Sequence, residues 1–420
     1  MSPVRPTVTV VGRRHEPEDH RLRDLLTRIA QPYDWHDADA PDGVALLERH
    51  GAGDRDLPLL VDEGEALTTA TVERLATAWR LTDPPRLDHY DLVVVGAGPA
   101  GLAAAVHAAS DGLRTLVLEE DVPGGQASHT SAIENFFGFP DGGIGGAELA
   151  RRAGRQAESF GAELSFLRGV VGSAVEPGGR FRVEVAGGVS VTGDLVIAAP
   201  GMEWRRLDVP GLHDLVGRGV YYGAGRSEAA QCDGDPVVVV GAGNSAGQAV
   251  MHLAQAGADV RMVVRGGSLG RMMSDYLVRR ITDHPRVEVL LHTEVAAVEA
   301  GDGRLAAVRL GGATEERLPA RALFVCIGGT PRTGWASAMG VRVDAAGYVL
   351  TGPDLLEDGR RPAGWPLARD PLALETSVPG LFAAGDVRHG STKRVAGAVG
   401  DGAVAVALAH RRLAELRPAG

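Results

Sequence analysis

Residues 91–101 read Asp91-Leu-Val-Val-Val-Gly-Ala-Gly-Pro-Ala-Gly101, an apolar run that leads directly into a glycine-rich turn. An alanine-rich helix should follow as far as Ser110, and the apolar run Thr115–Leu118 should form a second strand. In such a β-α-β unit the first glycine allows the tight turn, the second lets the backbone approach a pyrophosphate, and the third lets helix and strand pack closely. Unpaired N–H groups at the helix start would hold the phosphates of a dinucleotide. The residues expected to bind it are Gly96, Gly98, Pro99, Ala100 and Gly101, with Glu119 at the end of the second strand placed to bond ribose hydroxyls.

The same pattern returns at Val237-Val-Val-Val-Gly-Ala-Gly-Asn-Ser-Ala246, followed by a helix to about Gly257 and a strand at Val260–Val264. The position that often carries an acidic residue is occupied by Arg265, with Arg271 a short way on. A guanidinium binds a 2′-phosphate where a carboxylate would repel it, so this pattern favours NADPH over NADH. The alternative is that both arginines are ordinary solvated residues of an arginine-rich chain. The expected contacts to this second nucleotide are Gly241, Gly243, Asn244, Ser245, Ala246, Arg265 and Arg271.

The segment before the first glycine motif predicts a small α/β unit in the order β-α-β-α-β-(β)-α. Strands are expected at Thr7–Val11, Tyr33–His36 and Leu57–Val61, and helices at His20–Ala30, Val44–His50 and Thr71–Trp79. This order resembles the thioredoxin/glutaredoxin fold, with Pro58 where that family places a cis-proline. The loop that carries the reactive dithiol in that family is here Gly12-Arg-Arg-His-Glu-Pro-Glu18, without a cysteine. We therefore expect the fold without dithiol chemistry.

Composition limits the remaining possibilities. A chain of 420 residues fits two or three domains, and a net charge of −11 without blocks of like charge argues against a nucleic-acid partner or a membrane-surface helix. No apolar stretch is long enough to span a bilayer and no secretory leader is recognisable, so we expect a cytoplasmic protein. Two cysteines, far apart in sequence, form neither a disulfide framework nor a cysteine-rich metal site, and no metal is expected.

Three further segments resemble bacterial-type thioredoxin reductases. Pro123-Gly-Gly-Gln126 and Ile133-Glu-Asn-Phe-Phe-Gly-Phe-Pro140 look like the flavin-embracing segments of that family, and Ser377-Val-Pro-Gly-Leu-Phe-Ala-Ala-Gly-Asp386 looks like its second FAD signature. The resemblance covers residues 88–420 and implies that the first dinucleotide is FAD. It adds the expected FAD contacts Gly125, Gln126, Asn135, Gly385 and Asp386, and a helix start at Lys393, Arg394 and Val395 whose positive end faces the flavin. Lys393, the single lysine of the chain, stands where the family has an arginine; it is either a residue beside the flavin or a surface residue.

The resemblance also implies the architecture. The fold class is α/β, with two Rossmann-like (three-layer ββα) nucleotide-binding domains, the second inserted into the first, preceded by the thioredoxin-like unit. Two thin crossings between the domains, after Ala198-Ala-Pro-Gly201 at Trp204–Gly211 and again at Ile327–Pro331, would suit a hinge, and a homodimer is the expected assembly. The expected boundaries are 1–80 for the thioredoxin-like domain, 81–89 for a linker, 90–206 with 332–420 for the FAD domain, and 207–331 for the NAD(P)H domain.

One departure from the family changes the expected chemistry. The positions of its C-x-x-C dithiol hold Ala224-Gly-Arg-Ser227, so the thiolate relay from flavin to a protein substrate is lost. Glu228 follows where the family has an aspartate, and we expect either a proton donor near the flavin or an ordinary helix carboxylate. Cys232 and Cys326 are expected to be structural.

These observations favour an FAD-dependent NAD(P)H oxidoreductase. Hydride would pass from the nicotinamide to the flavin, and electrons would then leave directly to an acceptor: a small molecule, a quinone, an iron–sulfur protein or O₂. One alternative keeps disulfide reductase activity on an external disulfide. The other is a flavin and nucleotide redox sensor that docks a partner through its thioredoxin-like domain.

Overall fold

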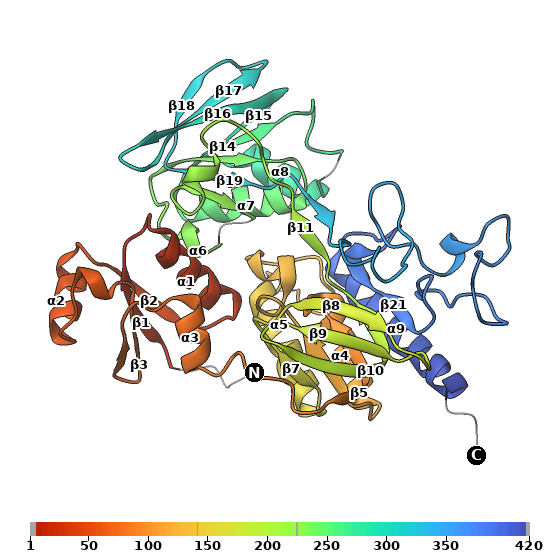
Figure 1. Cartoon of the computed structure of the whole chain (residues 1–420). Coiled ribbons are helices and arrows are strands. Elements are labelled where there is room, and N and C mark those ends of the chain that lie inside the picture. The colour runs from red at the N-terminus through yellow and green to blue at the C-terminus, as the bar shows by residue number, and fades with distance from the viewer. Residues whose placement is uncertain (1–5, 141, 224–225, 272, 417–420) are drawn as a thin grey trace.

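The first glycine motif lies in a large, mostly parallel sheet (Figure 1). The computed structural model describes residues 6–140, 142–223, 226–271 and 273–416. The strand order of this sheet is β7-β6-β5-β10-β9-β8, with β21 paired to β10. The pairs β10–β9 and β9–β8 are antiparallel, and all the other pairs are parallel. Its strands are β5 His89–Val95, β6 Thr115–Leu118, β7 Glu163–Ser165, β8 Val170–Val175, β9 Phe181–Val185, β10 Val189–Ala198 and β21 Leu381–Ala383. Because both faces of β5 are covered, its apolar residues run on without alternation.

Three helices cover one face of this sheet: α4 Pro99–Ser110, α5 Gly146–Ser159 and α9 Val395–Leu416. Alanines of α4 pack against both α5 and α9. A Cβ atom at Gly402 of α9 would collide with the carbonyl oxygen of Ala100, so the two helices touch nearly backbone to backbone. Short 3₁₀ turns in this part of the chain are η2 Gly125–His129, η4 Gly352–Leu355 and η5 Gly385–Val387. The contact between α4 and α9 brings the C-terminal segment to the glycine motif.

The second glycine motif lies in a separate, fully parallel sheet of order β12-β19-β13-β14-β15. Its strands are β12 Val220–Tyr222, β13 Pro236–Val240, β14 Asp259–Val264, β15 Val287–Leu291 and β19 Ala322–Val325. The associated helices are η3 His213–Leu215, α6 Arg226–Ala229, α7 Asn244–Gln255 and α8 Asp275–Asp283. An antiparallel sheet of β16 Thr293–Gly301, β17 Arg304–Gly312 and β18 Arg317–Pro319 covers the opposite side (Figure 1).

The two expected crossings are side by side. β11 Met202–Trp204 leads into the second sheet and β20 Gly329–Pro331 leads back, and the two pair antiparallel. Thus the second nucleotide unit is inserted into the first through a narrow two-stranded connection. The predicted fold class is confirmed.

The N-terminal segment, called the head from here on, forms a four-stranded sheet of order β2-β1-β3-β4, in which β1 and β2 are parallel and β3 is antiparallel to β1. Its elements are β1 Val8–Gly12, α1 Pro17–Arg28, β2 Tyr33–Asp37, α2 Pro41–Arg49, η1 Asp54–Asp56, β3 Leu59–Asp62, β4 Glu65–Leu67 and α3 Val72–Ala78. The expected elements are all present, and the Leu57–Pro58 peptide bond is cis.

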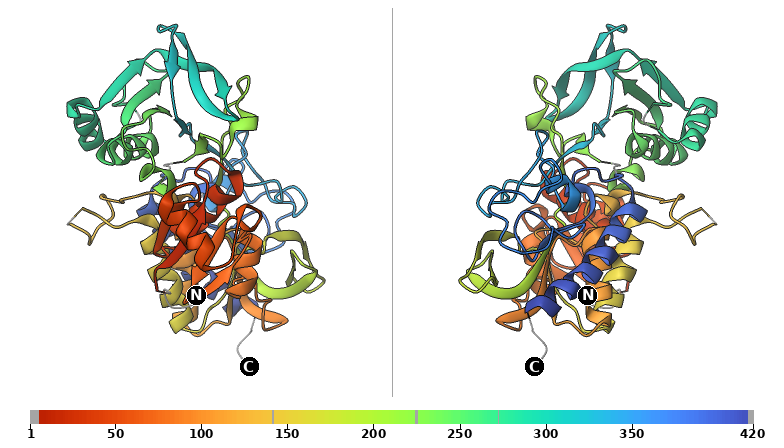
Figure 2. Two further views of the ribbon diagram at one scale, coloured as in Figure 1. Left: turned by 90° about the vertical axis from the view of Figure 1, so that its left-hand side faces the viewer. Right: turned by 90° about the vertical axis from the view of Figure 1, so that its right-hand side faces the viewer.

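The head packs against both nucleotide units. Its apolar core extends to Val122 and Leu167 of the flavin-side unit, and α1 contacts α6 of the second unit. Figures 1 and 2 show the head, in red, against the first sheet unit and below the second. Among the described helices, none has the length and apolar character needed to cross a membrane.

Candidate active site

The first glycine loop adopts the conformation that its sequence requires. Gly96 has a φ of 105°, and a Cβ atom there would collide with the carbonyl oxygen of Ala199. A Cβ atom at Gly101 would collide with the carbonyl oxygen of Gly96 itself. Helix α4 begins directly after Gly98, with Pro99 at its first position. The loop therefore presents a helix N-terminus with close-approaching backbone, which fits a pyrophosphate.

A cavity of about 500 Å³ opens in front of this helix N-terminus. Most of the expected FAD contacts line it, from segments far apart in the sequence: Gly98, Pro99, Ala100, Glu119, Gly125, Gln126, Asn135, Gly385, Asp386, Lys393, Arg394 and Val395. Gly96 and Gly101 do not line this cavity; they are the positions where a Cβ atom would collide with neighbouring backbone. The N-terminus of α9 starts at Val395, so two helix starts face one cavity, an arrangement that suits the phosphates and the electron-accepting ring of FAD.

Glu119 has a structural task besides the expected one. Its Oε2 accepts a hydrogen bond from the Ala97 N–H at 2.6 Å, and its Oε1 accepts one from the Asp121 N–H at 3.0 Å. Burial raises the pKa of this carboxyl group. Each oxygen keeps a lone pair, and the side chain lines the cavity, so bonding to ribose hydroxyls stays a prediction that the geometry permits.

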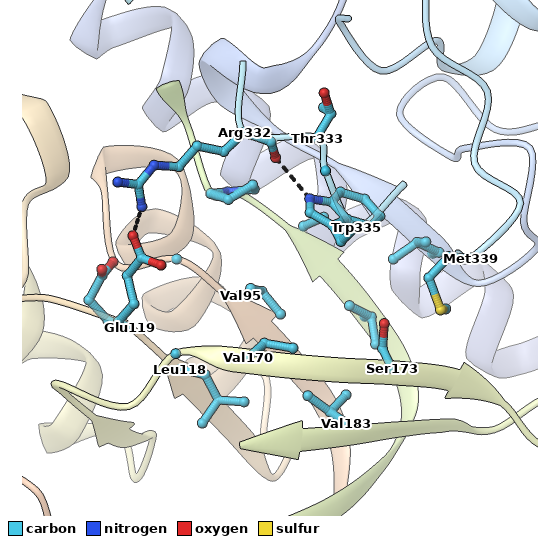
Figure 3. Close-up of a pocket in the computed structure, with 18 of the residues that line it drawn as sticks. Val95, Leu118, Glu119, Val170, Ser173, Val183, Arg332, Thr333, Trp335 and Met339 are labelled. Atoms are coloured by element: carbon cyan, nitrogen blue, oxygen red, sulfur yellow. Dashed lines mark hydrogen bonds and ion pairs between the residues drawn. The ribbon is translucent and has the colours of Figure 1, made fainter. Parts of the chain in front are cut away.

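A second, more apolar cavity of about 440 Å³ lies beside the first (Figure 3). In Figure 3, Trp335 and Arg332 stand over apolar side chains of the sheet, among them Leu118, Val170 and Val183. Arg332 forms an ion pair with Glu120, and its carbonyl oxygen accepts a hydrogen bond from Trp335 Nε1 at 2.8 Å. The two cavities share Glu119, Pro200, Glu203 and Arg332. Together they give room for an extended dinucleotide. Of the expected contacts, Gly96 and Glu119 line the second cavity, whereas its wall around Trp335 was not predicted from the sequence.

Lys393 is held by the loop that carries the second FAD signature. Its Nζ donates a hydrogen bond to the Asp386 carbonyl oxygen at 2.7 Å and lies 4.1 Å from the centre of the Tyr348 ring. The residue has a φ of 53°, an unusual value for a side chain of this size. Lys393 is therefore a cavity residue that also fixes the segment leading into α9.

The second glycine motif repeats the geometry of the first. Gly241 has a φ of 142°, and a Cβ atom there would collide with the carbonyl oxygen of Cys326. Helix α7 starts at Asn244, whose Oδ1 accepts a hydrogen bond from the Ser274 N–H at 2.8 Å. Asn244 and Ser245 line the large cavity together with the expected FAD contacts, so both nucleotide motifs open onto one space.

The two arginines expected to select NADPH lie elsewhere. Arg265 follows directly after β14, and both it and Arg271 are exposed. Within the described ranges neither side chain has a hydrogen-bond or ion-pair partner. Both guanidinium groups are free to bind a phosphate, and their selection of NADPH stays a prediction.

Glu228 does not fit the expected role of a proton donor. Its side chain is only 1% exposed and pairs with two residues of the head, His20 and Arg23. Burial raises its pKa, but the hydrogen bond from His20 and the charge of Arg23 outweigh that effect and lower the pKa to about 2. A carboxylate held ionised in this way carries no proton to donate at neutral pH. Of the lost dithiol positions beside it, residues 224 and 225 lie outside the described residues.

The head contributes to the site, which the sequence did not reveal. His20, Asp24 and Arg28 of α1 line the large cavity. Arg28 donates hydrogen bonds to Asp121 Oδ2 at 2.7 Å and to Ser128 Oγ at 3.1 Å. On the other side, Arg14 pairs with Asp235 at 2.7 Å. The head therefore bridges the two nucleotide units, because one helix and its preceding loop bind to both.

Both cysteines are buried and unreactive in their surroundings. Cys232 is close to Arg14, and Cys326 donates to the Gly223 carbonyl oxygen at 3.2 Å. Burial raises the pKa of each thiol to about 12, so neither forms a thiolate at neutral pH. Their expected structural role agrees with this geometry.

Comparison with known proteins places this site in a family. Residues 90–402 match the family model described as pyridine nucleotide-disulphide oxidoreductase. The chain is 31% identical over 336 residues to the thioredoxin reductase of Bacillus subtilis, covering 78% of this chain and 96% of that protein. It is 33% identical over 325 residues to that of Treponema pallidum, covering 75% and 94%.

The solved structures agree with the sequence relatives. Lactococcus lactis thioredoxin reductase in its FR conformation superposes with a TM-score of 0.67 at 27% identity, over 78% of this chain and 99% of that one. The thioredoxin reductase of T. acidophilum gives a TM-score of 0.67 at 27% identity, over 77% of this chain and 99% of that one. The chain therefore belongs to the pyridine nucleotide-disulphide oxidoreductase family, as a thioredoxin reductase-like flavoprotein oxidoreductase, and thioredoxin reductases use FAD and NADPH.

Proposed function

We propose that this protein passes electrons from NAD(P)H through FAD directly to an acceptor, without a dithiol of its own. The observation that carries the proposal is the state of the only two cysteines of the chain, Cys232 and Cys326. Both are buried, and burial raises the pKa of each thiol to about 12. Neither is available to relay electrons as a thiolate.

The shared cavity supports direct transfer. When bound, FAD supplies the ring that accepts hydride from the nicotinamide and releases electrons to the acceptor. The chain contributes two helix starts, at Pro99 and Asn244, whose N–H groups suit the phosphates of two nucleotides. Both helix starts face one cavity, so they suit two nucleotides held in the same space. Hydride transfer between the two nucleotides depends on this positioning and needs no nucleophilic side chain.

The position of the head argues against an external disulfide as the main acceptor. Helix α1 contacts α6, which contains Ser227, the second of the lost dithiol positions. This helix is thereby covered in cis by a thioredoxin-like unit that itself has no cysteine. We infer that a smaller acceptor, which enters the cavity itself, is the better fit; a quinone or O₂ meets this requirement.

The domain division and the assembly are part of the same proposal. The head would span residues 1–80, the linker 81–89, the FAD domain 90–206 with 332–420, and the NAD(P)H domain 207–331. The assembly would be a homodimer, since cyclic dimers are the commonest closed assembly of a single chain. Expression of residues 88–420 without the head, with gel filtration of both forms, tests the boundary and the assembly together.

The decisive experiment follows the flavin itself. Purified protein with bound FAD is mixed anaerobically with NADPH or NADH, and loss of the oxidised-flavin absorbance is recorded. We expect rapid bleaching with NADPH, followed by reoxidation with a quinone or O₂.

A Cys232→Ser/Cys326→Ser variant is the matched control, and it should behave as the unmodified protein does. Loss of acceptor reduction in that variant would contradict direct transfer and favour a thiol route. Absence of bleaching with both nucleotides, despite their binding, would instead favour a redox sensor that docks a partner through the head.

A further inference from the structure

A histidine of the head reaches the flavin-side cavity. His20 lies on α1 and lines the large cavity together with the expected FAD contacts. Its ring packs against Tyr221 of β12 with 4.7 Å between the ring centres, and its side chain is 21% exposed. A titratable side chain from another part of the chain is thus placed at the border between the two nucleotide units.

The ring is held through one nitrogen only. His20 Nδ1 lies 2.8 Å from Glu228 Oε1, and because this carboxylate is ionised, the nitrogen is the donor. The other ring nitrogen, Nε2, has no hydrogen-bond partner among the described residues. A neutral ring fixed in this way has its hydrogen on Nδ1 and an open lone pair on Nε2, the state of a group that can pick up and deliver a proton.

The carboxylate is itself rigidly placed. Arg23 Nη2 donates to both Glu228 oxygens, at 3.1 and 3.2 Å, and also to the Arg14 carbonyl oxygen at 2.9 Å. The Arg23 guanidinium lies over the Trp35 ring at 4.3 Å. A fully buried arginine, stacked on an aromatic ring, thus fixes the carboxylate that orients the histidine.

We propose that His20 delivers a proton from Nε2 to the electron acceptor in the cavity, and that Glu228 is its positioning residue. The proposal rests on the proposed function. Reduction of a quinone to the hydroquinone needs two electrons and two hydrogens. NAD(P)H supplies the electron pair and one hydrogen as hydride through the flavin. The second hydrogen is the proton from the protonated ring of His20, which regains it from solvent.

The other histidine of the cavity is less suited to this task. His129 lies against Trp204, and burial together with the charge of Arg28 lowers its pKa to about 4. A ring with this lowered pKa takes up a proton from solvent unfavourably at neutral pH, so it is poorly suited to deliver one. Asp24, at 3.7 Å from its ring, does not offset this effect.

The test separates proton delivery from electron transfer. The flavin is first reduced with dithionite, so that the step does not depend on a nucleotide, and is then mixed in a stopped-flow instrument with benzoquinone or with ferricyanide. Benzoquinone must gain protons, whereas ferricyanide takes up electrons alone. We expect H20Q to slow reoxidation by benzoquinone by about 100-fold, the usual contribution of a positioned acid, and reoxidation by ferricyanide by less than twofold. In H20A, added imidazole should restore part of the benzoquinone rate.

The matched control is H36Q. His36 also pairs with a carboxylate, Asp42, but within the head and outside the cavity. This variant should leave both rates unchanged. An equal loss with both acceptors in H20Q would show a merely structural role, and no loss with either would also overturn the proposal.

The role of Glu228 needs a readout besides turnover. In ¹⁵N-histidine-labelled protein, the two ring nitrogens of His20 should show the hydrogen on Nδ1, and this signature should be lost in E228Q. Addition of FAD should shift the Nε2 signal of His20 and leave those of His36 in place. A neutral ring with its hydrogen on Nε2, or no response to FAD, would overturn the proposal. Failure of NAD(P)H to bleach the flavin would count against the proposed function alone, because the dithionite experiment does not use it.

Discussion

The buried pair between the head and the second nucleotide unit leads to a quantitative prediction. Arg23 is fully buried and Glu228 is 1% exposed. Two of the three guanidinium nitrogens of Arg23, Nε and Nη1, already have no hydrogen-bond partner, so the charge of this arginine is balanced chiefly by Glu228. In Glu228→Ala the guanidinium would keep only its bond to the Arg14 carbonyl oxygen.

Removing one partner of a buried ion pair typically costs about 3–5 kcal/mol. The direction of the Glu228 pKa agrees: although burial raises it, His20 and Arg23 lower it, so both favour the ionised carboxylate. Because this pair joins α1 to α6, the cost should fall on docking of the head rather than on the flavin-side sheet.

Urea unfolding with two probes tests this expectation. Tryptophan fluorescence, recorded in a background with phenylalanine at positions 204, 335 and 365, reports on the head through Trp79 and through Trp35, which lies under the Arg23 guanidinium. Release of FAD reports on the flavin-side unit. In Glu228→Ala the fluorescence transition should move to lower urea and separate from FAD release, while protease cleavage within residues 81–89 becomes faster.

The double variant Arg23→Met/Glu228→Leu provides the control, because apolar residues of similar size remove both charges at once. It should recover most of the lost stability. If Glu228→Ala unfolds with a single transition within about 0.5 kcal/mol of the unmodified protein, the size of an ordinary surface substitution, the pair does not hold the head in place.

Three further predictions follow from the same geometry. The lowered pKa of Glu228 means that its contribution to docking is complete above pH 4.5 and is lost as the pH falls towards about 2; acid titration of the fluorescence signal should show this loss, and Glu228→Gln should abolish it. Substituting Arg265 and Arg271 by alanine should raise the Kd for NADPH by about 10-fold or more, as expected for lost charge-assisted hydrogen bonds, and leave that for NADH unchanged in calorimetric titrations. Gly402→Ala should lower Tm and weaken FAD retention, because the added Cβ meets the backbone of Ala100. The expected loss in the free energy of unfolding is about 1–3 kcal/mol. Gly400→Ala, with open space at its Cβ position, is the control in the same thermal scans.

The nucleotide contacts could be read from the sequence because their chemistry is local. The first position of each turn admits only glycine, because a Cβ atom at Gly96 or Gly241 would collide with the backbone that follows a neighbouring strand, and this need leaves a spaced motif in the chain. The loss of the dithiol was equally visible, since it is a matter of residue identity. The sequence left open whether Glu228 is a proton donor or an ordinary helix carboxylate, because it does not record that a distant segment places Arg23 beside that carboxylate.

The sequence by itself determined the fold class, the two nucleotide motifs, the thioredoxin-like head and the presence of only two cysteines, far apart in the chain. These features could be recognised because their signals are local. Apolar periodicity, turn glycines and the identity of single residues can be read without knowing which distant segments come into contact. Only the tertiary structure decided that both motifs open onto one cavity, that the head closes one side of it, and that His20 and Arg23 meet Glu228 across some two hundred positions of the chain. Such contacts depend on how separately folded units dock, and docking is set by surface shape and charge that no local pattern records.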